Sequence, residues 1–255
     1  MEENDQKGEN QKIGKVTATA LSRRLSTRPT DAVIKICTFN VQGGTEAKLN
    51  QAARCLQEMN IDIGLLTETR LQGMHTTNCE GYEIVATKVT NKHQGGIALC
   101  YKKSALFHLE GTKQFGENIL STNLMSGGKR WTIIGVYIPP SETNGTTLEQ
   151  LQAAVSAGGE SSLIILGDLN TNLDGLKEHE KDDERKNETI AIIKETGVQD
   201  LSRHFTRNRE NRGDWTWSQK REGRWINGKC DYILTTERAD FKNFSYKTPR
   251  MASYH

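Results

Sequence analysis

Polar side chains that could act on a phosphate follow four apolar stretches of the sequence. Asp168 and Asn170, two positions apart, follow LIILG, and Tyr137 ends WTIIGVY. Asn40 follows VIKICTF, and Glu68 follows IDIGLLT. Each has a plain structural explanation when taken alone, because Asn, Asp and Gly are common where strands end. Four strand ends that supply a carboxylate, an amide or a phenol are harder to explain in this way, since such ends in one sheet converge on one rim.

The elements that must position these side chains alternate between strands and helices. Apolar runs predict strands over residues 33–39, 61–68, 97–103, 131–138, 163–168, 231–236 and 241–246. Apolar residues at helical spacing predict helices over residues 46–60 and 147–157, and a charged loop and helix follow over residues 177–197. Most of the strands are continuous apolar runs, which must be covered on both faces. We therefore predict a layered α/β fold in which two sheets pack on each other with helices outside.

The composition of the chain narrows its class. At 255 residues, with 35% hydrophobic and 26% charged residues, it can build one sizeable core. Five cysteines at wide, irregular spacing, without a CxxC pair, argue against a disulfide framework or a zinc site and favour a reducing compartment. No apolar run reaches the length of a membrane span, and the first residues are too polar for a secretory signal. We expect a soluble, intracellular protein whose polar residues 1–31 form a disordered leader.

The ordered set of motifs resembles the endonuclease/exonuclease/phosphatase superfamily, which has the fold of pancreatic deoxyribonuclease and the abasic-site endonucleases. Any one motif is weak, but eight in the order of the family are specific. They span residues 33–255 and read CTFNVQG, LLTETR, QGGIALCYK, GVYIPP, ILGDLN, TWS, CDYIL and SYH. GVYIPP, GDLN and the pairing of TWS with CDYIL resemble the endonuclease domain of non-LTR retrotransposons most. The resemblance implies one domain over residues 32–255, a four-layered α/β sandwich of two packed mixed sheets flanked by helices.

The resemblance also assigns a metal site. Hydrolysis of a phosphodiester needs a cation that neutralises phosphate charge, a base for water and a group that stabilises the leaving oxygen. Magnesium is a hard cation that keeps several waters and takes one or two protein carboxylates. Glu68 matches the metal ligand of the family, for Mg²⁺ or Mn²⁺. Asn40 would orient Glu68 or take part in the metal site.

The other matched residues would act on the water and the leaving group. Asp168 matches the residue that holds or activates the attacking water, and Asn170 would help to position it. Asp231 would accept a hydrogen bond from His255, which fixes the tautomer of the imidazole and favours its protonated form beside the phosphate. Tyr137 matches a phenol that lines the site.

Two departures from the family lie at the end of the sequence. The family ends this motif in Ser-Asp-His, whereas this chain has Tyr254 before His255. A phenol, with a pKa near 10, does not replace a metal-supporting aspartate at neutral pH. The family also continues into another strand after the histidine, so we expect a domain truncated at its C-terminal strand. The chain would then be a fragment of a longer protein or a decayed copy with impaired activity.

Local charge, not the net charge of +2, points to a nucleic-acid surface. Residues 203–229 carry eight Arg or Lys against three acidic residues, with three tryptophans between them. The residues expected to contact phosphates are Arg207, Arg209, Arg212, Lys220, Arg221 and Arg224. The alternative is an exposed hairpin whose tryptophans pack against the sheet, and we expect this role for Trp217. The acidic stretch over residues 178–185 is expected to be a solvated surface.

Three functions remain open. The first is a DNA-nicking endonuclease domain derived from a non-LTR retrotransposon, which leaves a 3′-hydroxyl for target-primed reverse transcription. It would act as a monomeric domain in the nucleus, fused to a reverse transcriptase in the full-length protein. The second is a phosphatase or RNA-directed relative, and the third is a catalytically impaired remnant. The basic segment favours the first over a small-molecule phosphatase, whereas Tyr254 favours the third.

Overall fold

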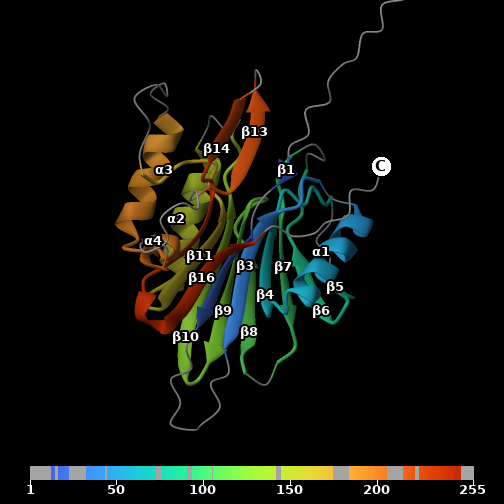
Figure 1. Ribbon diagram of the computed structural model, residues 1–255. Helices are drawn as coiled ribbons and strands as arrows, with labels where there is room; N and C mark the ends of the chain where they lie inside the picture. Colours follow the sequence, from blue (N-terminus) through green and yellow to red (C-terminus); the bar gives the residue numbers. More distant parts are fainter. Residues whose placement is uncertain are drawn as a thin grey trace, which may run out of the picture.

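Two large β-sheets packed face to face, with helices on their outer faces, form the body of the protein in a computed structural model (Figure 1). The residues that the structure describes are 13–14, 17–22, 33–43, 45–72, 76–90, 94–104, 106–141, 145–174, 184–205, 215–221 and 224–247. The predicted four-layered α/β sandwich is therefore confirmed.

The first large sheet has seven strands. In spatial order they are β16 (Phe241–Lys247), β2 (Thr17–Ser22), β3 (Ile34–Asn40), β4 (Ile63–Thr67), β7 (Ile97–Lys102), β6 (Tyr82–Ala86) and β5 (Thr76–Cys79). Strands β3 and β4 run parallel, and the other neighbours run antiparallel, so the sheet is mixed.

The second large sheet has six strands. In spatial order they are β12 (Gln199–Asp200), β15 (Asp231–Thr235), β11 (Ser162–Asp168), β10 (Lys129–Tyr137), β9 (Ile119–Ser126) and β8 (His108–Gln114). It is also mixed, because β10 and β11 run parallel while their neighbours run antiparallel. Each sheet thus has one parallel pair, and each pair ends in residues that the sequence analysis singles out.

A small third sheet stands apart from the sandwich. It consists of β1 (Ile13–Gly14), β13 (Trp217–Arg221) and β14 (Arg224–Gly228). The hairpin of β13 and β14 projects beyond the end of the large sheets (Figure 1).

Helices cover the outer faces of both large sheets. They are α1 (Glu46–Glu58), α2 (Thr146–Gly158) and α3 (Glu184–Glu195), whereas α4 (Leu201–Phe205) places Leu201 in the core between the sheets and the 3-10 helix Arg238–Asp240 directly precedes β16. Helix α1 begins at Thr45, whose hydroxyl accepts a hydrogen bond from the backbone N–H of Lys48, and Glu46 in the first turn suits the helix dipole. Its buried stripe packs on the seven-stranded sheet, and α2 and α3 pack on the six-stranded sheet. No helix in the described residues has the length and hydrophobicity that a membrane span requires.

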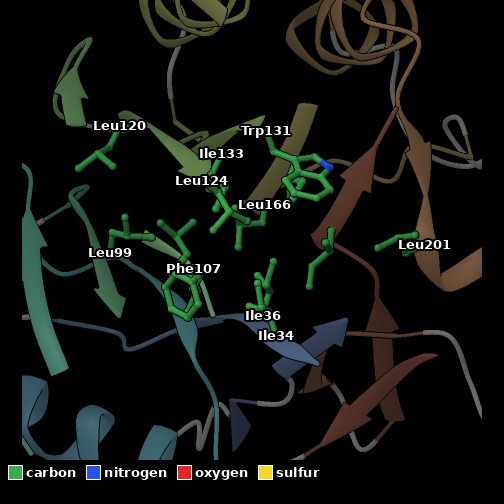
Figure 2. Close-up of a cluster of buried hydrophobic side chains, with 14 of the residues drawn as sticks. Ile34, Ile36, Leu99, Phe107, Leu120, Leu124, Trp131, Ile133, Leu166 and Leu201 are labelled. Carbon is green, nitrogen blue, oxygen red and sulfur yellow. The ribbon is translucent and has the colours of Figure 1, made fainter. Parts of the chain in front are cut away.

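The largest hydrophobic cluster fills the space between the two sheets (Figure 2). Ile36 on β3 and Leu99 on β7 meet Ile133 on β10 and Leu166 on β11 in this cluster. The sheets approach closely at Gly135, where a Cβ atom would lie 2.4 Å from a methyl carbon of Leu65. A larger residue at position 135 would push the sheets apart.

The polar N-terminal segment contributes to the fold where the sequence predicts a disordered leader. Residues 17–22 form β2, which pairs with β3 on one side and β16 on the other, and residues 13–14 form β1. The prediction for residues 1–31 does not hold for these strands. Thr17 and Thr19 favour extended backbone, and two flanking strands supply the hydrogen bonds that the polar composition did not reveal.

Candidate active site

The alternation of side chains along strands explains why polar residues meet at one end of the sandwich. On β11, Leu166 belongs to the core between the sheets, and Asp168, two positions later, lies on the same face. On β3, Ile36 faces this core and Asn40 shares its face. The same alternation brings two further side chains to this end of the core, Tyr137 on β10 and Asp231 on β15. These strand ends therefore come from two facing sheets and not, as the sequence analysis expects, from the rim of a single sheet.

Asn40 joins the two sheets at this end. Its Nδ2 donates to Glu68 Oε1 at 2.7 Å and to Asp168 Oδ2 at 3.3 Å. Its Oδ1 accepts from the backbone N–H of Gln42 at 2.9 Å. Asn40 therefore presents N–H groups, and not its oxygen, to the two carboxylates, an arrangement that orients Glu68.

Glu68 lies one residue beyond β4 in a loop with unusual backbone geometry. Its φ is +56°, which is a costly conformation for a residue with a side chain. Six described non-glycine residues have positive φ, and four of them belong to loops around this site: Gln42, Glu68, Arg70 and Asn170. Such strain persists only where surrounding contacts impose it, and it concentrates at functional sites.

Burial and mutual repulsion raise the pKa of both aspartates of the site. The pKa of Asp168 is raised to about 6, mainly by burial and also by the charge of Glu68, while hydrogen bonds from Asn170 and Asn40 and the charge of Arg185 act in the opposite direction. Asp231 pairs with Asp168 across the sheet, and its pKa is raised by burial and then by the charge of Asp168. The site thus holds more negative charge than its protein surroundings balance.

One oxygen of Asp231 lacks a donor among the described residues. Asp231 is 6% exposed, and its Oδ1 is buried without a hydrogen-bond partner there. Its backbone N–H donates to Oγ1 of the buried Thr216 at 3.1 Å. His255, the donor that the family resemblance implies for Asp231, lies outside the described residues, as does Tyr254.

Tyr137 closes one side of the carboxylate cluster. Its pKa is raised above the usual value by burial, then by the charges of Glu68 and Asp168, and by a hydrogen bond with Glu68. The phenol therefore stays protonated and can act as a donor at the site.

Asn170 lies in the loop that follows β11 and not on the strand itself. Strand β11 ends at Asp168, and Asn170 follows with a φ of +46°. Its backbone N–H donates to Asp168 Oδ1 at 2.9 Å, and its Nδ2 donates to the carbonyl of Ile138 at 2.9 Å. Asn170 thus ties the end of β10 to the end of β11 and holds Asp168 from one side.

Comparisons with known proteins identify the family to which the chain belongs. The sequence pattern of the Endonuclease/Exonuclease/phosphatase family matches residues 37–255. The chain belongs to this family. A comparison of the sequence with curated proteins gave no match.

Solved structures of this family share the fold at low identity. The endonuclease domain of TRAS1, a telomere-specific non-LTR retrotransposon, is 19% identical with a TM-score of 0.59, over 80% of this chain and 85% of that chain. An AP endonuclease from Archaeoglobus fulgidus is 20% identical with a TM-score of 0.56, over 80% and 86% of the two chains. The 3′ phosphatase NExo from Neisseria, bound to a product DNA hairpin, is 18% identical with a TM-score of 0.54, over 80% and 86%. At these identities the likeness is one of fold.

The donors of the site fit a hard divalent cation that keeps part of its hydration. No group of three or more His, Cys, Asp and Glu residues that could hold a metal occurs in the described part of the chain. Two carboxylates, those of Glu68 and Asp168, do accept from the same Nδ2 of Asn40, and oxygen ligands of this kind suit Mg²⁺, which needs only one or two of them. Burial and, to a lesser degree, the charge of Glu68 raise the pKa of Asp168, and a cation beside the two carboxylates would favour its ionised form.

Two arginines contact residues of the candidate site, although the sequence analysis did not include them among the site residues. Arg70 Nη2 donates to Glu68 Oε2 at 2.9 Å. Arg185, in the first turn of α3, donates to the carbonyl of Asn170 at 3.4 Å. Arg70 stands two residues after Glu68 in LLTETR, so its proximity was readable from the sequence. Arg185 ends the stretch expected to be solvated surface, and only the packing of α3 brings it to the site.

The expected nucleic-acid residues are partly placed on the projecting hairpin. Lys220 and Arg224 are exposed there, and Trp225 is 54% exposed. Lys220 and Trp225 pair across the two strands, so their side chains share one face. Trp217 is half-buried and its indole lies over Gly228, in line with the packing role expected for it. The side chains of Arg207, Arg209, Arg212 and Arg221 lie outside the described residues.

Proposed function

We propose that this protein is a divalent-cation-dependent endonuclease that nicks DNA, of the kind found in non-LTR retrotransposons. The observation that carries the proposal is the Asn40 amide, which holds Glu68 from one sheet and Asp168 from the other within hydrogen-bond distance. Two neighbouring carboxylates suit a cation-assisted attack of water on a phosphodiester, because one can hold the cation while the other accepts the proton of the water. A divalent cation at Glu68 would neutralise charge on the scissile phosphate.

The other residues of the candidate site have separate proposed roles. Asp168 takes a proton from the attacking water, because its carboxylate is ionised at neutral pH and can act as a base. Asn40 and Asn170 hold the Asp168 carboxylate from two sides and fix its orientation. Asp231 orients the group that protonates the leaving oxygen, for which we propose His255. Tyr137 donates a hydrogen bond within the carboxylate cluster.

The projecting hairpin supports DNA as the substrate rather than a small phosphoester. It begins and ends beside the site, because β14 ends at Gly228 and β15 begins at Asp231. Its exposed face combines Lys220, which suits a phosphate, with Trp225, which suits stacking on a base. A substrate longer than one phosphoester can contact both the hairpin and the site. The motifs shared with non-LTR retrotransposon endonucleases support a nick that leaves a 3′-hydroxyl.

Metal removal tests the proposed activity. We expect the protein to convert supercoiled plasmid to the nicked form in Mg²⁺ or Mn²⁺, to stop in EDTA and to recover when excess Mg²⁺ is added. Nicked plasmid should serve as a primer for a DNA polymerase without prior treatment, since the product carries a 3′-hydroxyl. Nicking that persists in EDTA would contradict the cation requirement. Hydrolysis of p-nitrophenyl phosphate without plasmid nicking would favour the phosphatase function instead.

Variants of the hairpin test the DNA surface. Trp225→Ala should weaken binding of a short duplex by about tenfold, because loss of one stacked base costs about 1–3 kcal/mol. Lys220→Gln should weaken binding less and should lower the slope of log affinity against log salt by about one, the loss of a single phosphate contact. Neither variant should lower the maximal nicking rate at saturating DNA. The control is Lys113→Gln on the exposed strand β8, away from the hairpin. Unchanged duplex affinity in both hairpin variants would remove the hairpin from the interface.

A further inference from the structure

Both carboxylate oxygens of Glu68 are engaged by donors of the protein. Oε1 accepts from Asn40 Nδ2 at 2.7 Å, and Oε2 accepts from Arg70 Nη2 at 2.9 Å. The Glu68 side chain is 19% exposed and that of Arg70 is 33% exposed, so water weakens their attraction less than it would on the open surface. A cation that binds Glu68 would therefore share these oxygens with donors already in place, one of which is the positively charged guanidinium of Arg70.

The backbone holds Arg70 against Glu68. Both residues have positive φ, +56° for Glu68 and +52° for Arg70. The loop between them is fixed from outside, because the N–H of Thr69 donates to the carbonyl of Gly96 at 3.0 Å and that of Arg70 donates to the carbonyl of Gly95 at 2.9 Å. Two costly conformations in one short loop need such support, and together they turn the arginine back onto the carboxylate.

The Arg70 guanidinium has hydrogen-bonding capacity that Glu68 does not use. Its Nε is buried and has no hydrogen-bond partner among the described residues. Its Nη1 lies 3.5 Å from the position that a Cβ atom would take on Gly43, so the guanidinium lies between that loop and Glu68. A planar guanidinium with donors to spare suits a second anion, and phosphate oxygens match its geometry.

We propose that Arg70 competes with the divalent cation for Glu68, so that cation and phosphodiester bind cooperatively. This inference rests on the proposed function. In the free protein the guanidinium occupies Oε2 and lowers the affinity of Glu68 for the cation. A phosphate of the substrate binds the Arg70 guanidinium, which then releases Oε2 of Glu68. Because Oε2 is free, the cation binds more tightly. By linkage the cation then raises the affinity for the substrate by the same factor.

If Arg70 orients Glu68 instead of competing for it, the change in cation affinity on removing Arg70 has the opposite sign. If Arg70 served only to orient Glu68 toward the cation, its removal would weaken cation binding. If it competes, its removal strengthens cation binding in the absence of substrate. The direction of one measured affinity therefore decides between the two roles.

The experiment is a titration with Mn²⁺, followed by calorimetry and by the electron paramagnetic resonance signal of free Mn²⁺. Without DNA, Arg70→Gln should bind Mn²⁺ about tenfold more tightly than the unmodified protein, a coupling in the usual range for linked sites. A short duplex with phosphorothioate linkages, which resist hydrolysis, should tighten Mn²⁺ binding to the unmodified protein by a similar factor. The same duplex should have little effect on Mn²⁺ binding to Arg70→Gln. Mn²⁺ bound by the duplex alone is measured separately and subtracted.

Two further variants serve as controls for the Arg70→Gln titration. Arg54→Gln removes an Arg–Glu pair of the same 2.9 Å length from the surface, where Arg54 contacts Glu80, and should leave the Mn²⁺ affinity unchanged. Arg70→Lys keeps the charge without the planar fork and should give an intermediate affinity even if Arg70→Gln folds poorly. Equal or weaker Mn²⁺ binding by Arg70→Gln and Arg70→Lys overturns the inference and leaves the proposed function intact. Absence of Mn²⁺ binding by the unmodified protein, with and without duplex, overturns both.

Discussion

Asp168→Asn is expected to lower the nicking rate by about a thousandfold or more while making the cation-free protein more stable. The rate falls because the amide cannot accept the proton of the attacking water, a step for which a positioned base contributes about 10²–10⁴-fold. Stability rises because the buried carboxylate is destabilised by its surroundings, as the rise of its pKa to about 6 records. The measurements are plasmid nicking in Mg²⁺ and thermal unfolding in EDTA.

The pH dependence of this gain follows from the direction of the shift. The folded protein holds the Asp168 proton more tightly than the unfolded chain does, so its stability falls as pH rises from the ordinary aspartate pKa through about 6. The melting temperature of Asp168→Asn should therefore exceed that of the unmodified protein by several degrees at pH 7.5, and the difference should shrink toward zero near pH 4. The matched control is Glu195→Gln, an exposed carboxylate on α3, which should change neither quantity. Near-normal nicking by Asp168→Asn would remove this residue from the chemistry.

Glu68→Gln should also abolish measurable nicking, but with the opposite effect on stability. The amide binds a divalent cation far more weakly than a carboxylate does, so we expect a loss of at least about a hundredfold in rate that excess Mg²⁺ does not restore. Arg70 loses its anionic partner in this variant, so the cation-free protein should melt at a lower temperature than the unmodified protein.

A thermal shift on adding Mn²⁺ completes the measurement for Glu68. The unmodified protein should be stabilised by the cation, and Glu68→Gln should not, because only binding to the folded state raises stability. A full Mn²⁺-induced shift in Glu68→Gln would place the cation elsewhere. The two variants thus distinguish Asp168, whose ionised carboxylate destabilises the cation-free protein, from Glu68, whose ionised carboxylate stabilises it.

The fold was readable from sequence where strands are apolar on both faces. Strands β3, β10 and β11 lie within the predicted runs to within about two residues, because burial on both sides demands continuous apolar sequence. Strand β8, with the sequence HLEGTKQ, was missed because it is an exposed edge strand with no apolar pattern. The hairpin of β13 and β14 was expected only as the alternative to a DNA-contacting loop, and β1 was missed because it lies in the polar segment predicted to be a disordered leader.

The types of the site residues were predictable, but their arrangement was not. Asn40 and Asp168 could be singled out because each follows an apolar strand, yet nothing in either motif states that the two strands belong to different sheets. The contact of Arg185 with Asn170 depends on how α3 packs, which no local pattern encodes. Asn170 itself leaves the strand geometry through a positive φ, so a period of two did not apply to it.

The placement of Asn40 between two sheets means that the candidate site is complete only when both sheets have packed together. Asn40 and Glu68 belong to the seven-stranded sheet, whereas Asp168 and Asp231 belong to the six-stranded sheet. A chain that has folded only one sheet, whether on the ribosome or after partial unfolding, holds either Glu68 or the two aspartates, and it lacks the contact between Asn40 and Asp168 that joins the sheets. Such an intermediate lacks the proposed active site, however well its single sheet is formed. The seam between the sheets therefore acts as a safeguard, since the proposed nuclease would be active only in completely folded copies of the protein.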